Sequence, residues 1–127
     1  MLKNKSVLLS STPEDGIRVC VMRSIHDEYE FDLWYQALAP SRKLVEDYVI
    51  NKKISWNQFQ KNYLREQKSR KAYLLQLITL IEKAHKNNLD VTLLCGEEDF
   101  RGCHREIIMR ELIKLKPEIK KLMVDKL

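Results

Sequence analysis

Cys103, His104 and Arg105 are consecutive in the chain and follow another cysteine, Cys95, by a few residues. A thiol becomes a strong nucleophile when it loses its proton, and a helix N-terminus or a nearby guanidinium lowers its pKa. An adjacent imidazole can accept that proton and return it. We therefore predict an activated-thiol site with Cys103 as the nucleophile and His104 as the acid/base. The alternative is that the cysteines are small buried hydrophobes and that the other two side chains lie on a helix surface.

The segment around these residues predicts a pocket that binds an anion. Residues 91–95 form an apolar run typical of a buried strand, residues 96–102 a turn, and Cys103 the start of a helix. In open α/β sheets, ligands bind outside the carboxyl ends of the strands and beside helix N-termini. We expect a nucleotide, a phosphate or another anionic substrate, with the cofactor left open. The candidate ligand-binding residues are Arg23, Cys95, Glu97, Arg101 and Arg105.

Two other kinds of site use the same residues. Cys95 and Arg101 have the Cys-x5-Arg spacing of phosphatase and rhodanese loops, where backbone N–H groups and an arginine hold an oxyanion. The acidic residues at 97–99 would repel a phosphate there unless they point away. Cys95, Cys103 and His104 are also competent zinc ligands. No metal site is expected, because no Cys-x2-Cys pair is present and helix neighbours point about 100° apart.

A basic segment offers an alternative function, that of a non-catalytic nucleic-acid-binding module. The chain has 23 Lys+Arg against 18 Asp+Glu, a net charge of +5. Within residues 52–71, one acidic residue, Glu66, stands against the basic residues Lys52, Lys53, Lys61, Arg65, Lys68, Arg70 and Lys71. Basic residues interleaved with aromatic ones can bind single strands by charge and stacking. The spacing of Trp56, Phe59 and Tyr63 instead favours burial on one helix face, so only weak binding is expected. A protein-interaction domain without a small-molecule site is a third possibility.

Length and composition indicate one globular domain over residues 1–127. The 127 residues are 44% hydrophobic and 32% charged, with 3 Gly and 3 Pro, which excludes collagen-like, mucin-like and disordered chains. Three cysteines cannot all pair with one another. No apolar run approaches the ~18 residues of a membrane span, and the run behind the basic start is too short for a signal peptide. We expect a soluble, cytoplasmic protein with free thiols and no membrane partner; its oligomeric state is left open.

The pattern of apolar residues predicts a small α/β fold. Strands are expected at 17–23 and 91–95, with a weaker candidate at 7–9, and helices around 33–38, 44–49, 56–63, 73–84, 108–115 and 117–123. The long helical excursion between the two clear strands is typical of a crossover connection, which makes them parallel. We predict a mostly parallel sheet of three to five strands with helices on both faces, a three-layer sandwich. The main competitor is an all-helical domain with one hairpin.

The chain resembles the YeaO-like branch of the family called domain of unknown function 488. The similar pieces are residues 15–23 (DGIRVCVMR), 31–34 (FDLW), 38–41 (LAPS), 56–59 (WNQF), 91–95 (VTLLC) and 103–105 (CHR). Cys95 together with 103–105 looks more like the other branch of the family, in which the strand ends in Cys and the next helix starts Cys-His-Arg. In the family, the strand's Arg follows an acidic residue and precedes Leu-Trp-Pro-Arg-Gly. Here Arg23 is kept, while the acid, the Trp and the second Arg are absent. The resemblance implies a small α/β domain with a polar pocket and implies no particular reaction.

Overall fold

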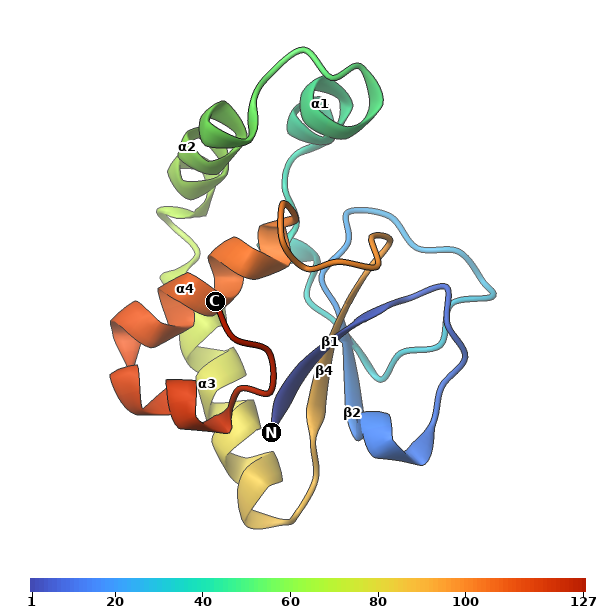
Figure 1. Cartoon of the computed structure of the whole chain (residues 1–127), viewed down its shortest axis with the longest axis vertical. Helices are drawn as coiled ribbons and strands as arrows, with labels where there is room; N and C mark the ends of the chain where they lie inside the picture. Colours follow the sequence, from blue (N-terminus) through green and yellow to red (C-terminus); the bar gives the residue numbers. More distant parts are fainter.

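Four parallel strands form the sheet that positions the thiol segment (Figure 1). The computed structural model describes all 127 residues, and its strands are β1 (Leu2–Ser6), β2 (Ile17–Cys20), β3 (Leu33–Trp34) and β4 (Val91–Cys95). Their spatial order is β1-β4-β2-β3. β4 is central, with Leu93 opposite Asn4 on one side and Val19 on the other. The predicted parallel α/β fold is therefore confirmed, and the all-helical alternative is excluded.

The helices connect and cover the strands. They are α1 (Arg42–Val45), α2 (Trp56–Gln67), α3 (Lys71–Lys86) and α4 (His104–Leu115). A π-helical turn, η3 (Glu46–Ile50), continues α1, and short 3₁₀ helices form at Pro13–Asp15, Gln36–Leu38 and Pro117–Leu122. A capping box begins α2, because the Ser55 hydroxyl accepts from Gln58 N and the Gln58 side chain accepts from Ser55 N. None of the helices is long and apolar enough to span a membrane.

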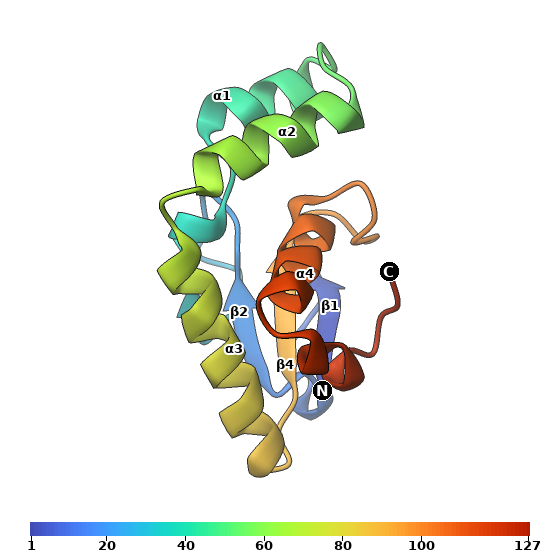
Figure 2. The same cartoon turned by 90° about the vertical axis from the view of Figure 1, so that its left-hand side faces the viewer.

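The two faces of the sheet are covered differently. α3 and α4 lie on one face, where the core side chains of the strands include Leu2, Val19 and Leu93 (Figure 2). Asn4 on this face donates to Met109 Sδ of α4. On the other face, Thr92 donates to the backbone oxygen of Asp15, so the Pro13–Asp15 turn and the loops cover it. A short 3₁₀ helix and loops therefore stand where the second expected helical layer would lie.

The strand expected at 17–23 ends at Cys20, and two other elements differ more from the sequence-based expectation. The first strand is Leu2–Ser6 and not residues 7–9. The sequence does not predict this strand, because Lys3 and Lys5 interrupt the apolar pattern that would indicate it. Both lysines make ion pairs beside the sheet, with Asp90 and Asp15 respectively. Residues 33–38 do not form one helix. Leu33–Trp34 is a short edge strand on β2, followed by the 3₁₀ turn Gln36–Leu38.

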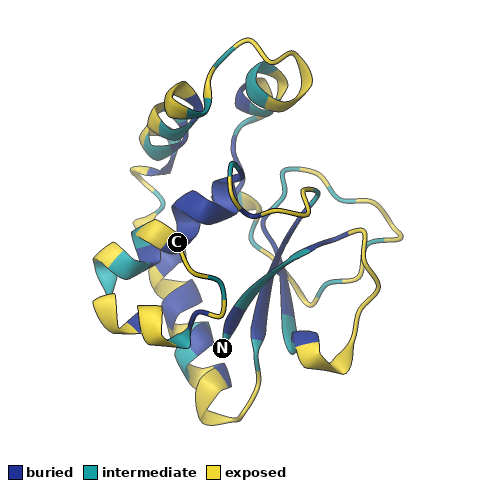
Figure 3. Ribbon diagram, in the orientation of Figure 1, coloured by how far each residue is buried: buried dark blue, intermediate teal, exposed yellow.

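Burial concentrates where the sheet meets α4. Figure 3 shows the central strands and the start of α4 as buried, while α1, α2 and the far end of α3 expose one side. β4 is buried at every position because strands flank it and both of its faces are covered. The first six residues of α4, His104 to Met109, are buried as well. The thiol segment therefore joins two of the most enclosed parts of the molecule.

Asp15 is the centre of a buried charge cluster on the face opposite the helices. Its carboxylate accepts hydrogen bonds from Lys5 Nζ at 3.0 Å and from Arg18 Nη1 at 2.5 Å. The side chains of Asp15 and Arg18 are only 8% and 3% exposed. Burial raises the pKa of Asp15, but hydrogen bonds from Lys5, Thr12 and Arg18 outweigh it and lower the pKa from 3.8 to about 2.

Asp15→Asn is expected to lower the free energy of unfolding by about 2 kcal/mol at neutral pH. A carboxyl with a depressed folded-state pKa stabilises the protein above its unfolded pKa of 3.8 and loses that contribution as pH falls towards about 2. Urea unfolding of both proteins at neutral and acidic pH measures the difference. The two curves should converge in acid, whereas a gap that is the same at every pH would show that the ionised carboxylate is not what stabilises the fold.

Candidate thiol site

The predicted strand–turn–helix segment is confirmed and brings three reactive side chains together. Cys95 ends β4, and Cys103 is the N-cap residue of α4, directly before His104. One ligand-forming atom from each of these residues lies within 4.8 Å of those of the other two, and all three residues are buried. Gly102, with φ 72°, makes the turn that brings the chain back to the helix. The three side chains therefore form a single cluster at the carboxyl end of the central strand.

The cluster forms because Cys103 is not helical. Its φ of −118° and ψ of 154° are extended, so the angle of about 100° between helix neighbours does not apply to Cys103 and His104. Cys103 Sγ instead lies 3.6 Å from His104 Nδ1. The same geometry makes Cys95, Cys103 and His104 the one group of donor atoms in the chain close enough together to hold a metal ion. The sequence-based argument that the Cys103 and His104 side chains point apart is therefore wrong, because it assumed that both residues are helical.

The His104 ring is oriented by the backbone of β2. Its Nε2 lies 2.7 Å from the carbonyl oxygen of Val21. A carbonyl only accepts hydrogen bonds, so Nε2 carries a proton and donates it. In the neutral ring this leaves Nδ1 unprotonated and facing the Cys103 thiol. His104 is thus placed to accept the proton of Cys103, with Val21 serving as the group that orients the base.

The pKa values of Cys103 and Cys95 are shifted in opposite directions. The hydrogen bond from Cys95 to Cys103 is the largest cause that lowers the pKa of Cys103, and the charges of His104 and Arg105 lower it further against the effect of burial. The pKa of Cys103 lies well below the ordinary 9.0. The same hydrogen bond, followed by burial and the charge on Cys103, raises the pKa of Cys95. Cys103 is therefore the more acidic thiol of the pair, and Cys95 is the one that keeps its proton more tightly.

Arg105 supports this arrangement from inside the protein. Its side chain is fully buried, and Nε donates to Cys103 Sγ at 3.5 Å. Its terminal nitrogens donate to the backbone oxygens of Lys5 at 2.9 Å, of Glu97 at 2.6 Å and of Asp99 at 3.3 Å. None of these partners is a carboxylate. Arg105 therefore ties the loop after β4 to β1 and places a positive charge beside the thiol, and it is not among the residues that line the adjoining cavity.

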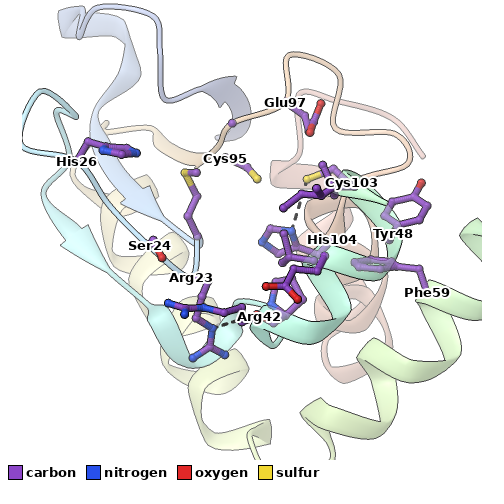
Figure 4. A pocket seen from close by; sticks show the side chains of 17 residues that line it. Arg23, Ser24, His26, Arg42, Tyr48, Phe59, Cys95, Glu97, Cys103 and His104 are labelled. Atoms are coloured by element: carbon purple, nitrogen blue, oxygen red, sulfur yellow. Dashed lines mark hydrogen bonds between the residues drawn. The ribbon is translucent and has the colours of Figure 1, made fainter. Parts of the chain in front are cut away.

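A cavity of about 450 Å³ opens in front of the cluster (Figure 4). Of the residues singled out in the sequence, it brings together Arg23, Cys95, Glu97, Cys103 and His104. Arg101 is not among its lining residues; it is exposed, with its guanidinium carbon 5.4 Å from the centre of the Phe100 ring. Lining residues that the sequence analysis did not identify include Arg42, Glu46, Tyr48 and Phe59.

On the basic side of the cavity, two arginines have hydrogen-bond donors without a protein partner. Arg23 donates from Nε to Pro40 O at 3.1 Å and from Nη2 to Ala39 O at 3.5 Å, which leaves Nη1 without a protein partner. Arg42 is exposed and makes no side-chain hydrogen bond or ion pair. In Figure 4 both arginines lie across the cavity from the sulfur atoms, with His104 between. The two guanidinium groups can therefore bind an anionic group at a distance from the thiol.

The opposite wall is aromatic and comes from the helices beyond the carboxyl ends of the strands (Figure 2). The Tyr48 and Phe59 rings stack with centroids 4.5 Å apart. The Tyr48 hydroxyl donates to Gly102 O at 3.1 Å, so η3 is fastened to the loop that precedes Cys103. Burial raises the pKa of Tyr48, which keeps its hydroxyl protonated as a donor. This wall favours a flat or apolar substituent beside the anionic group.

The basic segment at 52–71 is not one helix. Lys52 and Lys53 precede α2, and Lys71 begins α3. Phe59 and Tyr63 are each 2% exposed, and Trp56 is half-buried and stacks on Phe59. The aromatic residues therefore belong to the core, as their spacing predicts, and leave no stacking surface among the exposed cations.

A family model described as "Active DUF488-N3 subclade" matches residues 3–116. No curated protein and no solved structure matches the chain. The matched region contains β2, β3, β4, all of β1 except Leu2, and the complete thiol cluster, and it ends at the residue after α4.

Proposed function

We infer that this chain, a member of the DUF488 family, is an enzyme in which Cys103 acts as a nucleophile on a small anionic substrate. The observation that carries the inference is the contact of 3.6 Å between Cys103 Sγ and His104 Nδ1, at the wall of a cavity of about 450 Å³. The description of the matched subclade as active supports a catalytic role over a structural one. A merely structural cysteine needs neither an oriented imidazole nor a cavity.

The proposed reaction is a group transfer through a covalent intermediate. His104 Nδ1 takes the proton of Cys103, which gives a thiolate and an imidazolium. The thiolate attacks an electrophilic centre of the substrate and forms a bond from sulfur to that centre. The bond to the leaving group breaks, and the leaving group receives the proton from His104. Water then attacks the intermediate while His104 accepts one of its protons, and the thiolate departs.

The anionic part of the substrate is assigned to the arginine side of the cavity. Arg23 Nη1 and the Arg42 guanidinium offer charge-assisted hydrogen bonds to a phosphate or carboxylate. Glu46 and Glu97 also line the cavity, so its charge is mixed rather than uniformly positive. An anion that carries one apolar substituent, which would contact Tyr48 and Phe59, fits this arrangement better than a polyanion does.

Phenyl phosphate is expected to protect Cys103 from iodoacetamide, and Arg23→Ala is expected to weaken that protection about tenfold. Arg23 Nη1 is the free donor beside the anion, and the Arg23 side chain has no carboxylate partner whose loss would unfold the protein. Labelling rates measured against phenyl phosphate concentration give the apparent affinity. Arg101→Ala is the matched control, because Arg101 is exposed and lies outside the cavity. Equal protection by neutral benzyl alcohol, or an unchanged affinity in Arg23→Ala, would contradict an anion site.

Oligonucleotides are expected to bind only weakly and without sequence preference. Lys61 and Arg65 are exposed and supply charge, but Phe59 and Tyr63 are buried and cannot stack on bases. Binding by charge alone falls steeply as salt rises. Fluorescence anisotropy at low and physiological salt, with Lys61→Glu and Arg65→Glu as controls, measures this. Sub-micromolar binding that survives physiological salt and is lost in the double variant would favour the nucleic-acid-binding module instead.

A further inference from the structure

The site contains a second thiol, Cys95, which has no role in the proposed reaction. Its sulfur lies within 4.8 Å of Cys103 Sγ, and both residues line the same cavity. Figure 4 shows the two sulfur atoms facing each other at one wall of the cavity. Cys20, by contrast, is fully buried and does not line the cavity. The protein therefore carries one paired set of thiols and one isolated thiol.

We propose that Cys103 is a reversible oxidation site for small hydroperoxides and that Cys95 is the thiol that resolves the oxidised form. The proposal rests on the proposed function in one respect, since it needs Cys103 to be a thiolate. It adds a second substrate class for the same sulfur and a role for Cys95.

The chemistry balances within the site and the peroxide. The Cys103 thiolate attacks one peroxide oxygen, the O–O bond breaks, and Cys103 becomes a sulfenic acid. The departing alkoxide takes the proton held by the His104 imidazolium and leaves as an alcohol. Cys95 then attacks the Cys103 sulfur, the S–O bond breaks, and hydroxide leaves with the Cys95 proton as water. The two sulfurs lose two electrons in total, the hydroperoxide gains two, and a disulfide remains until a dithiol reduces it.

The two cysteines belong to different elements, which suits these roles. Cys95 is held in the central strand, opposite Ser6 of β1, and its carbonyl accepts from Val7 N at 2.8 Å. Cys103 follows a loop that contains Gly102 and precedes the first helical turn, where its own backbone is extended. Because the two sulfurs already lie within 4.8 Å of each other, forming a disulfide bond of roughly 2.05 Å requires Cys103 Sγ to shift by less than about 3 Å while Cys95 stays in place.

The cavity also selects the oxidant. Cys95 and Cys103 are each less than a tenth exposed, and a solute reaches them through the cavity of about 450 Å³. Hydrogen peroxide and small alkyl hydroperoxides fit such a space, whereas another protein's disulfide does not reach the buried sulfurs. A neighbouring protonated thiol captures the sulfenic acid before further oxidation makes it irreversible.

The test treats the reduced full-length protein with one equivalent of hydrogen peroxide and follows the products by intact-mass and peptide mass spectrometry. The wild-type protein is expected to lose two hydrogens, to yield a peptide linked through Cys95 and Cys103, and to recover both thiols with dithiothreitol. Cys95→Ser is expected to form no disulfide and to gain one oxygen at Cys103, and a second oxygen when a further equivalent of peroxide is added. Cys20→Ser is the matched control and should behave as the wild type does.

Two results would overturn the proposal, and they differ from a failure of the proposed function. If the wild-type protein and Cys95→Ser gain oxygens at Cys103 equally and no linked peptide forms, Cys95 does not resolve the oxidised thiol. If iodoacetamide labels Cys103 rapidly but peroxide leaves it unchanged, the peroxide proposal fails while the nucleophile stands. If Cys103 reacts with neither reagent, both the oxidation site and the proposed function are wrong.

Discussion

Iodoacetamide is expected to label Cys103 on the order of a hundredfold faster than Cys20 at neutral pH. Only the thiolate is alkylated, and the Cys95 hydrogen bond, with His104 and Arg105, lowers the pKa of Cys103 well below 9.0. Burial instead raises the pKa of Cys20, which is fully buried and away from the cavity. The comparison is internal to one protein and one reaction, so protein concentration and reagent quality cancel.

A mass-spectrometric labelling time course gives both rates. His104→Asn should slow the labelling of Cys103, because it removes the proton acceptor 3.6 Å from the sulfur. His85→Asn is the matched control, since His85 is exposed near the end of α3. Equal rates at the two cysteines, or a faster Cys20, would remove the case for an activated thiol.

Arg105→Met is expected to cost about 3–5 kcal/mol of unfolding free energy. The fully buried guanidinium donates to three backbone carbonyls and to Cys103 Sγ, so its removal leaves buried acceptors without partners. Arg101→Met should change stability by no more than about 0.5 kcal/mol, because Arg101 is exposed. Urea unfolding of both variants measures the contrast. If they are equally stable, Arg105 does not hold the loop, and its role as a ligand-binding residue regains support.

Sequence patterns predicted the elements whose signals are local. β4 is apolar at nearly every position, and Ser55 with Gln58 has the spacing of a capping box, so both were identifiable without the structure. β1 was missed because Lys3 and Lys5 satisfy their charges through partners distant in the sequence. The edge strand Leu33–Trp34 cannot be told from helix in the sequence, because two apolar residues have no periodicity of their own.

In the candidate site, too, features with a local sequence signal could be predicted, and features that depend on distant contacts could not. The proximity of Cys103 to His104 follows from their adjacency once the helix is known to begin at residue 104. Adjacency could not distinguish Arg101 from Arg105, since which one points inward depends on carbonyl groups of the β4 loop and of β1. The cavity wall formed by Tyr48 and Phe59 depends on how the helices of the crossover pack beyond the sheet. No local pattern encodes that packing.

The most direct test of the central claim, that Cys103 is a thiolate at neutral pH, is a titration of thiolate absorbance in the ultraviolet. The wild-type protein and Cys103→Ser are titrated from acidic to alkaline pH, with Cys20→Ser as the control. We predict thiolate absorbance in the wild type already at neutral pH, lost in Cys103→Ser and kept in Cys20→Ser. Absorbance that rises only near the ordinary thiol pKa of 9.0, in the wild type as in Cys103→Ser, would contradict the account.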